Sequence, residues 1–498
     1  MNTRIRHICA AATAILLPGC ALSPEMPDPD SPDGPAFPVA ASGQVKPAAL
    51  PSKGRLGLQQ CIDFAIENNF SVRQSLAMAR ATRALETAQR AEFDPQLYGS
   101  VRAGRPTDGS WGDGEYSAGV VKKFTTGTEV DLEGGQVSTR TGDFRDDYLG
   151  GSTSDFAASV RQPLLKGAGR TANLAGIRLA ELLSTQASAT VTADLLETLR
   201  SVETTYYSAT IAALVEKSQM ESYSRALKLV EDVKVRRKAG AAPQIDELEA
   251  DAALSEARER LVQSQKNSRD RVGDLWLALG APLGDELPDV KLASLADATL
   301  PEETPDGTAA FNRAMSTAPS AILIVNEVQR KEIELLRARN RALPRLDAEV
   351  SVASATDDAG GDDFEGVALL RFNVPWGMRA EKAQLAAAQA DLQRSVAAQD
   401  QATQRLKQRI FELCRAIQAG RAQVNATAHT ARVSRKKYDE QALRLKAGAA
   451  TVRDLRESEE ELRSSEVREQ QARLGLFAGW SALTQLDGTI VQRHGLSL

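Results

Sequence analysis

The sequence contains few of the residues from which catalytic and metal sites are built. Its 498 residues include four cysteines and three histidines. No CxxC, HExxH, GxSxG or Walker pattern occurs, and only His429 and His494 lie beyond the N-terminal leader described below. A nucleophile or a metal centre has few candidate residues, so we expect no enzyme activity, no metal and no cofactor.

Aromatic residues and an excess of positive charge are also lacking. Phe, Trp and Tyr make up 5% of the chain, whereas Ala, Gln, Glu and Arg are frequent, a composition that favours long helices over several compact cores. The formal charge is -5, and removal of a leader that carries Arg4 and Arg6 but no acid leaves 59 basic against 66 acidic residues. This balance argues against nucleic acid as a partner.

The leader is too short in its apolar part to span a bilayer as a stable helix. Arg4 and Arg6 precede the apolar run from Ile8 to Leu17, which is the pattern of a secretory signal over residues 1–19. The ending Leu17-Pro18-Gly19-Cys20 resembles the lipobox of bacterial lipoproteins, although Pro18 is unusual there. That resemblance implies acylation of Cys20 and an outer-membrane location; a plain cleaved signal with an incidental cysteine is the alternative.

Two cysteines remain after the leader and the lipidation position are set aside. A disulfide between Cys61 and Cys414 is permitted in an oxidising compartment, but their separation in space does not follow from the sequence. Two buried thiols are the alternative. Residues 20–55 are rich in proline and have too few apolar residues to form a core, so they are expected to be a tether.

Beyond the tether the chain repeats one arrangement, with proline and glycine at matching places. Arg90 to Leu97 reads RAEFDPQL and Arg339 to Leu346 reads RNRALPRL; Lys238 to Asp246 reads KAGAAPQID and Lys446 to Asp454 reads KAGAATVRD. We expect a first repeat over residues 56–279, a proline-rich connector over 280–308, a second repeat over 309–490 and a tail over 491–498. Four prolines mark the expected helix–strand junctions: Pro95, Pro163, Pro344 and Pro375.

Most of each repeat has helical periodicity. A helix without a breaker is predicted from Leu58 to about Arg90. Two longer helical hairpins are predicted as well, and a helix over 174–238 would be roughly 100 Å long. Such helices pack side by side through their Ala-rich faces, as in a coiled coil. The predicted helices of the hairpins are 174–238, 243–279, 380–446 and 451–483.

Between the helices lie four short segments in which apolar and polar residues alternate. They are Leu97–Ala103, a stretch around Phe156–Val160, Leu346–Val352 and Ala368–Val374. Residues 104–155 are expected to form external loops, with a hairpin at Lys123–Thr128. One chain has no element to cover the apolar sides of these strands, but lipid can. Because a spanning barrel needs at least about eight strands, we expect a homo-oligomeric barrel.

A glycine stands where each long hairpin must reverse. Lys238 precedes Gly240 and Lys446 precedes Gly448, as at a helix C-terminus. An acid follows six residues after each glycine, at Asp246 and Asp454. Glu457 comes three positions after Asp454, on the same helical face. A cap and a turn explain the glycines without any further function.

Taken together, these segments resemble the TolC-like outer-membrane efflux protein family, the outer-membrane factors. The resemblance rests on the two octapeptides, on QPLL at Gln162–Leu165 followed by Gly167, on FNVPWG at Phe372–Gly377 and on the two glycine turns. It covers about Leu58 to Leu486. It implies a mainly helical homotrimer in which four strands per chain complete a twelve-stranded barrel on a periplasmic tunnel of helical hairpins.

The resemblance also implies partners and sites. It predicts a passive outer-membrane channel that receives substrate from an inner-membrane pump through a periplasmic adaptor. The acids predicted to ring the entrance as a gate are Asp454, Glu457 and Asp246. Ala450 and Leu445 depart from residues of the family's closing network, which Arg453 or Arg456 would have to replace. The residues predicted to dock the adaptor are Ala239, Gly240, Ala241, Ala447, Gly448 and Ala449.

Two alternatives remain at this point. A periplasmic coiled-coil scaffold or adaptor without a pore would explain the long helices, but not the alternating strands bounded by proline. The sequence does not decide between export of drugs or metals and export of a polypeptide, because substrate choice is expected to belong to the pump; the lipobox favours an efflux pump by family analogy only.

Overall fold

The computed structural model describes residues 55–103, 114–141, 149–240, 243–282, 291–292, 304–357 and 362–496. The predicted signal, the lipidation position Cys20 and nearly all of the 20–55 tether lie outside the described residues. So do Ala241, most of the 280–308 connector and the last two residues of the 491–498 tail.

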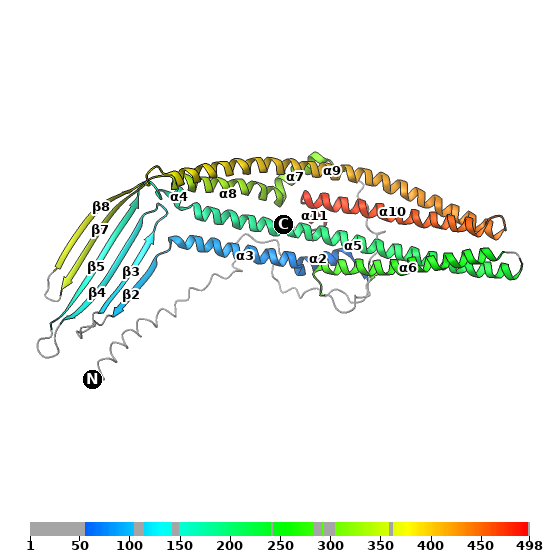
Figure 1. Ribbon diagram of the computed structural model, residues 1–498, viewed down its shortest axis with the longest axis horizontal. Helices are drawn as coiled ribbons and strands as arrows, with labels where there is room; N and C mark the ends of the chain where they lie inside the picture. Colours follow the sequence, from blue (N-terminus) through cyan, green and yellow to red (C-terminus); the bar gives the residue numbers. More distant parts are fainter. Residues whose placement is uncertain are drawn as a thin grey trace, which may run out of the picture. The chain divides into compact units, whose positions relative to one another are not determined.

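Long helices make up most of the described chain (Figure 1). α5 has 64 residues and turns back into α6, and α9 has 68 residues and turns back into α10. α5 also contacts α3, α8 and α10, and α8 contacts α9. None of the described helices is both long enough and apolar enough to cross a membrane. The bounds are α2 Leu58–Asn68, α3 Phe70–Arg90, α4 Arg170–Asn173, α5 Ala175–Lys238, α6 Gln244–Leu279, α7 Gly307–Thr317, α8 Pro319–Arg341, α9 Arg379–Lys446, α10 Val452–Leu486, α11 Ile490–Arg493 and the 3-10 turn η1 Ala91–Phe93.

The first predicted helix is divided in two, because Asn69 lies between α2 and α3 in an extended conformation. Its side-chain oxygen accepts hydrogen bonds from the backbone N–H groups of Ser71 and Val72, which caps α3. Its amide donates to the carbonyl oxygen of Ala278 at 2.8 Å. An Asn that bonds to nearby backbone competes with helix continuation, so the expectation of one unbroken helix was wrong.

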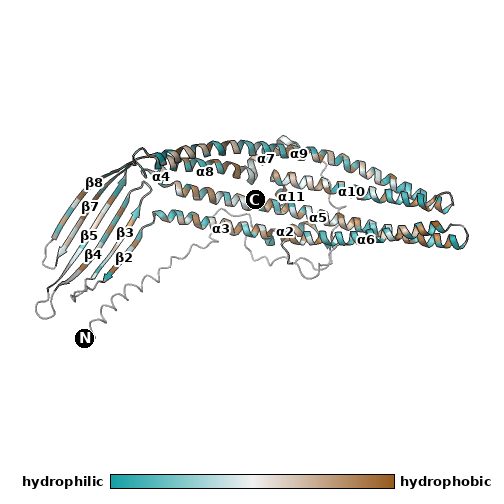
Figure 2. Ribbon diagram, viewed as in Figure 1, coloured by the Kyte–Doolittle hydropathy of each residue, from teal (hydrophilic) through white to brown (hydrophobic). Residues whose placement is uncertain are grey.

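The helices pack through small residues over most of their length and through large residues at a few places. The largest apolar cluster joins α2, α5 and α6, with Leu199, Leu275 and Leu279 fully buried. Elsewhere many of the residues that α5 buries are small, for example Ala180, Ala189 and Ala226. Figure 2 shows hydrophobic and hydrophilic residues interspersed along every long helix. Small buried residues allow the backbones of neighbouring helices to approach closely.

The C-terminal segment is anchored in the helix bundle by a buried carboxylate. Glu203 of α5 is fully buried. It is bonded to the guanidinium of Arg493 at 2.6 Å, to Nε2 of His494 at 2.5 Å and to the hydroxyl of Ser481. A buried carboxylate needs such partners. Residues 490–494 are thus part of the packed structure.

The sheet has six strands where four were predicted. All pairings are antiparallel, in the order β2-β3-β4-β5-β7-β8. The additional hairpin, β3 and β4, occupies residues that were expected to be external loops. Their many Gly, Asp and Thr residues suggested loops, although apolar residues alternate there too. The bounds are β2 Gln96–Ala103, β3 Gly114–Lys123, β4 Glu129–Thr141, β5 Leu149–Pro163, β7 Arg345–Asp357 and β8 Asp362–Asn373; β1 Arg55–Leu56 and β6 Lys291–Leu292 form a separate parallel pair.

The register divides the six-stranded sheet into an apolar face and a polar face. Cross-strand partners such as Leu132 and Ala158, or Val160 and Val350, share the apolar face. Large side chains on this face are exposed, for example Val101 at 85% and Phe372 at 62%. Asp131, Ser159 and the other alternate residues form the polar face. The apolar residues of this face include Leu97, Val101, Tyr116, Ala118, Val120, Val130, Leu132, Phe156, Ala158, Val160, Leu346, Val350, Val352, Ala368, Leu370 and Phe372.

The four marker prolines and the two cysteines have clear places. Pro95 lies between η1 and β2, Pro163 ends β5, Pro344 lies between α8 and β7, and Pro375 lies between β8 and α9. Cys61 and Cys414 are free and buried, in two different apolar clusters. Burial raises the pKa of the Cys61 thiol to about 12, so this thiol is not reactive at neutral pH.

Candidate functional site

The two helical turns have nearly the same backbone. Gly240, after α5, has a φ of 74°, and Gly448, after α9, has a φ of 75°. The N–H of Gly240 donates to the carbonyl of Arg237 at 2.9 Å, and that of Gly448 donates to the carbonyl of Leu445 at 3.1 Å. Glycine fits here because side chains disfavour positive φ. The repeat seen in the sequence thus marks two equivalent reversals.

Small exposed residues adjoin both glycines. Ala239 in the first turn, and Ala447 and Ala449 in the second, are exposed. Apart from the adjacent residues in the chain, no heavy atom of the described residues lies within 4 Å of the position that a Cβ would take at either glycine. Each turn therefore presents open backbone and methyl groups, which allow a partner to approach closely.

The two helices that leave these turns are capped differently. The hydroxyl of Thr451 accepts the N–H of Asp454 at 3.2 Å, and the Asp454 carboxylate accepts the N–H of Thr451 at 2.9 Å, which is a capping box. The corresponding N-cap of α6 is Pro243, which has no side-chain cap. The hydrogen bond from the Thr451 backbone, followed by that from its hydroxyl, holds the pKa of Asp454 below its ordinary value of 3.8.

The other two predicted gate acids are found near the same ends. Glu457 is exposed and pairs with Arg453 at 3.3 Å within α10. Asp246 lies in the first turn of α6, where a helix dipole favours a negative charge. A gate role was predicted for Asp454 and Glu457, but the cap that Asp454 forms and the ion pair that Glu457 forms with Arg453 were not predicted. Within one chain, the structure shows these two carboxylates bonded to their own helix.

Two arginines and two glutamates connect the hairpin ends to each other, and sequence reasoning did not find this contact. Arg456 of α10 lies 2.6 Å from Glu256 of α6, and Arg260 of α6 lies 3.2 Å from Glu460 of α10. The partners in each pair are about 200 positions apart in the chain, so no local sequence pattern predicts these two ion pairs. Arg453 and Arg456 were the two residues expected to replace the family's closing network. Arg456 makes this contact between two helices, whereas Arg453 pairs with a residue of its own helix.

A buried apolar cluster lies beside these ion pairs. Val233 of α5, Ala250 of α6 and Leu455 of α10 belong to it, together with Leu445 at the end of α9. The guanidinium of Arg236 donates to the carbonyl oxygen of Leu445 at 2.7 Å. The two hairpins of one chain are therefore held together near their turns by both packing and charge.

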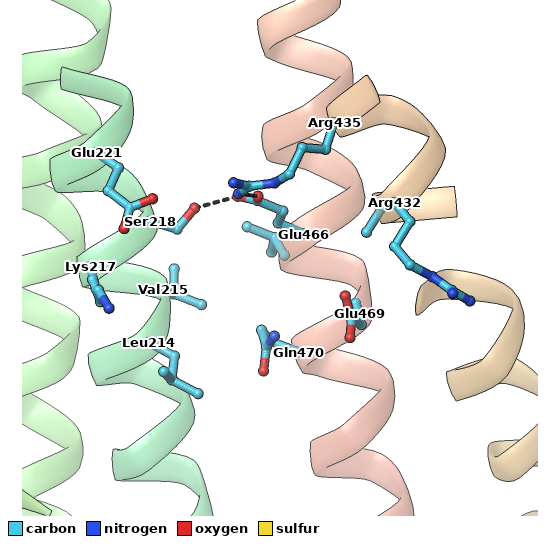
Figure 3. Close-up of a pocket in the computed structure, with 12 residues that line it drawn as sticks. Leu214, Val215, Lys217, Ser218, Glu221, Arg432, Arg435, Glu466, Glu469 and Gln470 are labelled. Carbon is cyan, nitrogen blue, oxygen red and sulfur yellow. Dashed lines mark hydrogen bonds and ion pairs between the residues drawn. The ribbon is translucent and has the colours of Figure 1, made fainter. Parts of the chain in front are cut away.

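A further groove lies between α5, α9 and α10 (Figure 3). It has a volume of about 310 Å³ and is lined by polar and aliphatic side chains. The Ser218 hydroxyl donates to the Glu466 carboxylate at 2.7 Å, and Arg435 pairs with the same carboxylate. Glu466 thus joins three helices. Within the described ranges, no three His, Cys, Asp or Glu side chains are grouped closely enough to hold a metal ion.

Comparisons with known proteins address the fold as a whole. No family model matches the chain. The solvent efflux pump outer membrane protein SrpC of Pseudomonas putida is 23% identical over 376 residues, which cover 70% of this chain and 68% of SrpC. The solved outer-membrane channel OprN superposes with a TM-score of 0.67 at 16% identity, over 86% of this chain and 89% of OprN. The chain has the fold of the TolC-like outer-membrane factors.

A second solved structure agrees with this assignment. The CmeC outer membrane channel of Campylobacter jejuni superposes with a TM-score of 0.66 at 12% identity, over 86% of this chain and 85% of CmeC. Fold similarity at such low identity does not extend to individual residues.

Proposed function

We propose that this protein is the outer-membrane channel of a tripartite efflux or export system and conducts substrate passively from an inner-membrane pump to the outside. The observation that carries the proposal is the exposed apolar face of the sheet, which runs across all six strands. In water such a face would favour aggregation. In a bilayer, lipid covers it.

Three copies form the channel. β2 and β8 are the edges of the sheet, and their backbone groups need partners within hydrocarbon. Because every pairing is antiparallel and the strand number is even, β2 and β8 run in opposite directions. β8 of one copy can thus continue into β2 of the next as another antiparallel pair. Closure of this ring removes both edges.

The helical hairpins form the periplasmic tunnel, and the turns dock the adaptor. The exposed small residues of both turns support this assignment, since backbone and methyl groups are accessible there. Acylation of Cys20 adds a second attachment to the outer membrane. The proposed docking residues are Ala239, Gly240, Ala241, Ala447, Gly448 and Ala449.

The gate is placed at the start of α10 and α6. Three copies of Asp454, Glu457 and Asp246 around one axis would repel one another and attract cations. Changing Asp454 to Asn together with Glu457 to Gln is expected to raise the conductance of purified trimers in planar bilayers and to weaken block by divalent cations. Thr451→Ala is the matched control, because it removes the cap and keeps both charges. Unchanged conductance and block in the charge variant would remove the gate assignment.

The proposal is tested by removing the lipid attachment. The variant Cys20→Ala is expected still to require detergent, to migrate as a trimer and to conduct ions after reconstitution. A periplasmic scaffold without a pore would instead be released as a water-soluble protein. Solubility as a monomer without detergent would overturn the channel proposal.

A further inference from the structure

The hairpin of β3 and β4 has the dimensions of barrel wall. A membrane-spanning strand needs about 9–11 residues. β3 has 10 residues and β4 has 13; β3 pairs along its whole length with β4, and β4 pairs along its whole length with β5. The hairpin lies between β2 and β5, so it separates the two strands that the first half was expected to contribute as a pair.

Both faces of this hairpin match the faces of the other strands. Tyr116 and Val120 on β3, and Leu132 on β4, continue the apolar face; Tyr116 is 54% exposed and Leu132 44% exposed. Glu115 and Asp131 lie on the polar face. Gly134 and Gln136 of β4 interrupt this face, but its apolar residues stay in register with those of the adjacent strands, which a hairpin folded over the outside of a barrel would not need.

Side chains of the polar face fix the hairpin on both sides. The Tyr98 hydroxyl on β2 donates to Asp131 on β4 at 3.0 Å, so its ring crosses β3. The crossing is possible because β3 has Gly119 there: a Cβ at that position would lie 2.4 Å from the Tyr98 ring. On the other side, Glu129 of β4 pairs with Arg161 of β5. The glycine is thus matched to the presence of β3 between its neighbours.

The width of the sheet fits the helices that join it. α3 leads into β2, β5 leads into α5, α8 leads into β7 and β8 leads into α9. Four helices side by side occupy about 32–40 Å at axis spacings of 8–10 Å. Strands about 4.8 Å apart and tilted by about 40° occupy about 38 Å when there are six, and about 25 Å when there are four. A sheet of six strands therefore has the same width as the four helices that it joins, whereas a sheet of four strands would be narrower.

We infer that β3 and β4 are inserted into the wall of the barrel, so that three copies of this chain close an 18-stranded barrel. This rests on the proposed trimeric channel and adds to it. The backbone radius of such a barrel is about 18 Å, compared with about 12 Å for twelve strands at the same tilt. The size limit for substrate then lies in the helical tunnel and its turns, and the exit admits bulkier solutes.

The first test asks which strand pairs with β2. In the six-stranded sheet Ser100 is opposite Ser117 of β3, with their hydroxyl oxygens 3.0 Å apart. If the hairpin lay outside the barrel, β2 would pair with β5, and the same register would place Ser100 opposite Asp155. The variant with Ser100→Cys and Ser117→Cys is expected to form an intrachain disulfide in outer membranes, read by mass spectrometry of its peptides.

The matched control carries Ser100→Cys and Asp155→Cys and is expected to remain reduced. Cross-linking of the control pair, or no cross-link in the Ser100–Ser117 pair, would overturn the inference. The readout does not require conduction, so it holds even if the channel proposal fails. Single-cysteine variants exclude disulfides to the buried Cys61 and Cys414.

The second test measures the width of the exit. Deletion of residues 104–148 joins Ala103 to Leu149, and the register places Ala103 opposite Ser152. Residues 149–151 then form a three-residue hairpin loop, and the apolar and polar faces stay in phase. Polyethylene glycols of graded size, added on the barrel side of reconstituted trimers, report the radius that they can enter. The cut-off radius is expected to fall by about 6 Å in the deletion variant.

Equal cut-off radii in two conducting proteins would reject the inserted hairpin and leave the channel proposal intact. Failure of the full-length protein to conduct would reject the channel proposal itself. If the deletion variant does not assemble, the cysteine pairs still decide the question, because they leave all six strands in place.

Discussion

The two halves of the chain build the same helical hairpin but contribute differently to the sheet. The first half supplies β2 to β5, whereas the second supplies β7 and β8. Both halves end their long helix at a glycine with positive φ. The helical hairpins of the two halves pack against each other over a long distance, and this packing constrains the length and the course of both. An antiparallel sheet accepts a further hairpin without a change of direction or face, so its strand number is free to differ.

The largest expected effect compares one lipid-facing residue from each half. Leu132→Arg in β4 and Leu370→Arg in β8 are each expected to lower the free energy of unfolding in lipid by about 2–4 kcal/mol, because a charge on the lipid side of a barrel is costly near the midplane. Urea unfolding of reconstituted protein measures it. Ser117→Arg, on the polar face of β3, is the control and is expected to have little effect. A much smaller loss of unfolding free energy for Leu132→Arg than for Leu370→Arg would indicate that the added hairpin lies outside lipid.

The next comparison is between the two turns. Gly240→Val and Gly448→Val are each expected to reduce stability by about 1–2 kcal/mol, since a side chain at positive φ is strained whether or not space is available. Thermal unfolding measures the loss, and pull-down with the adaptor measures docking. Ala447→Val adds bulk at a residue with a negative φ, so it separates the effect of side-chain size from that of backbone strain. Unequal losses in the two turns would show that they are not equivalent.

The caps of α6 and α10 are expected to differ in their response to mutation and acid. Thr451→Ala should cost about 1 kcal/mol, as the loss of an N-cap does, whereas Pro243→Ala removes no side-chain cap. Because the pKa of Asp454 is lowered in the folded state, its contribution is complete above the unfolded value near 3.8 and is lost as pH falls through the lowered pKa. Acid titration of helix content should therefore affect α10 in the wild type more than in Thr451→Ala. An identical acid response of the wild type and Thr451→Ala would show that the cap does not contribute to the stability of α10.

The smallest effect on stability is expected from the ion pair between the hairpin ends. Arg456 and Glu256 are partly exposed, so Arg456→Ala should change stability by about 0–1 kcal/mol. If the pair helps to keep the hairpin ends closed, the same change raises single-channel conductance. Exchange of the two charges, Arg456→Glu with Glu256→Arg, should restore the wild-type value. A conductance that follows stability alone would assign the pair a purely structural role.

The helices were largely predictable from the sequence, and the added strands were not. The predicted helix over 174–238 is α5, and the predicted helix over 380–446 is α9, each within a residue at its start. A lysine followed by a glycine ends both, and this is a local signal. The break at Asn69 was missed because its cause includes the carbonyl of Ala278, on another helix. The hairpin turn at Lys123–Thr128 was predicted and joins β3 to β4, but the two strands themselves were expected to be loops because glycines interrupt their alternation.

The candidate site divides in the same way. Gly240, Gly448, Asp246 and Asp454 were found from the repeat and Glu457 from its spacing to Asp454, whereas their docking and gate roles were implied by the family resemblance. The contacts from Arg456 to Glu256 and from Arg236 to the carbonyl of Leu445 join residues about 200 positions apart. No periodicity links such residues, and only the packing of α5, α6, α9 and α10 brings them together.

Local chemistry therefore set the ends of the long helices, the two reversals at glycine and the alternation of faces in four strands, because each depends on residues a few positions apart. Tertiary structure decided how many strands share the sheet and which charges connect the hairpins. Strand pairing and ion pairing depend on which distant segments become neighbours, and the free energy of that choice is shared among contacts across the whole fold.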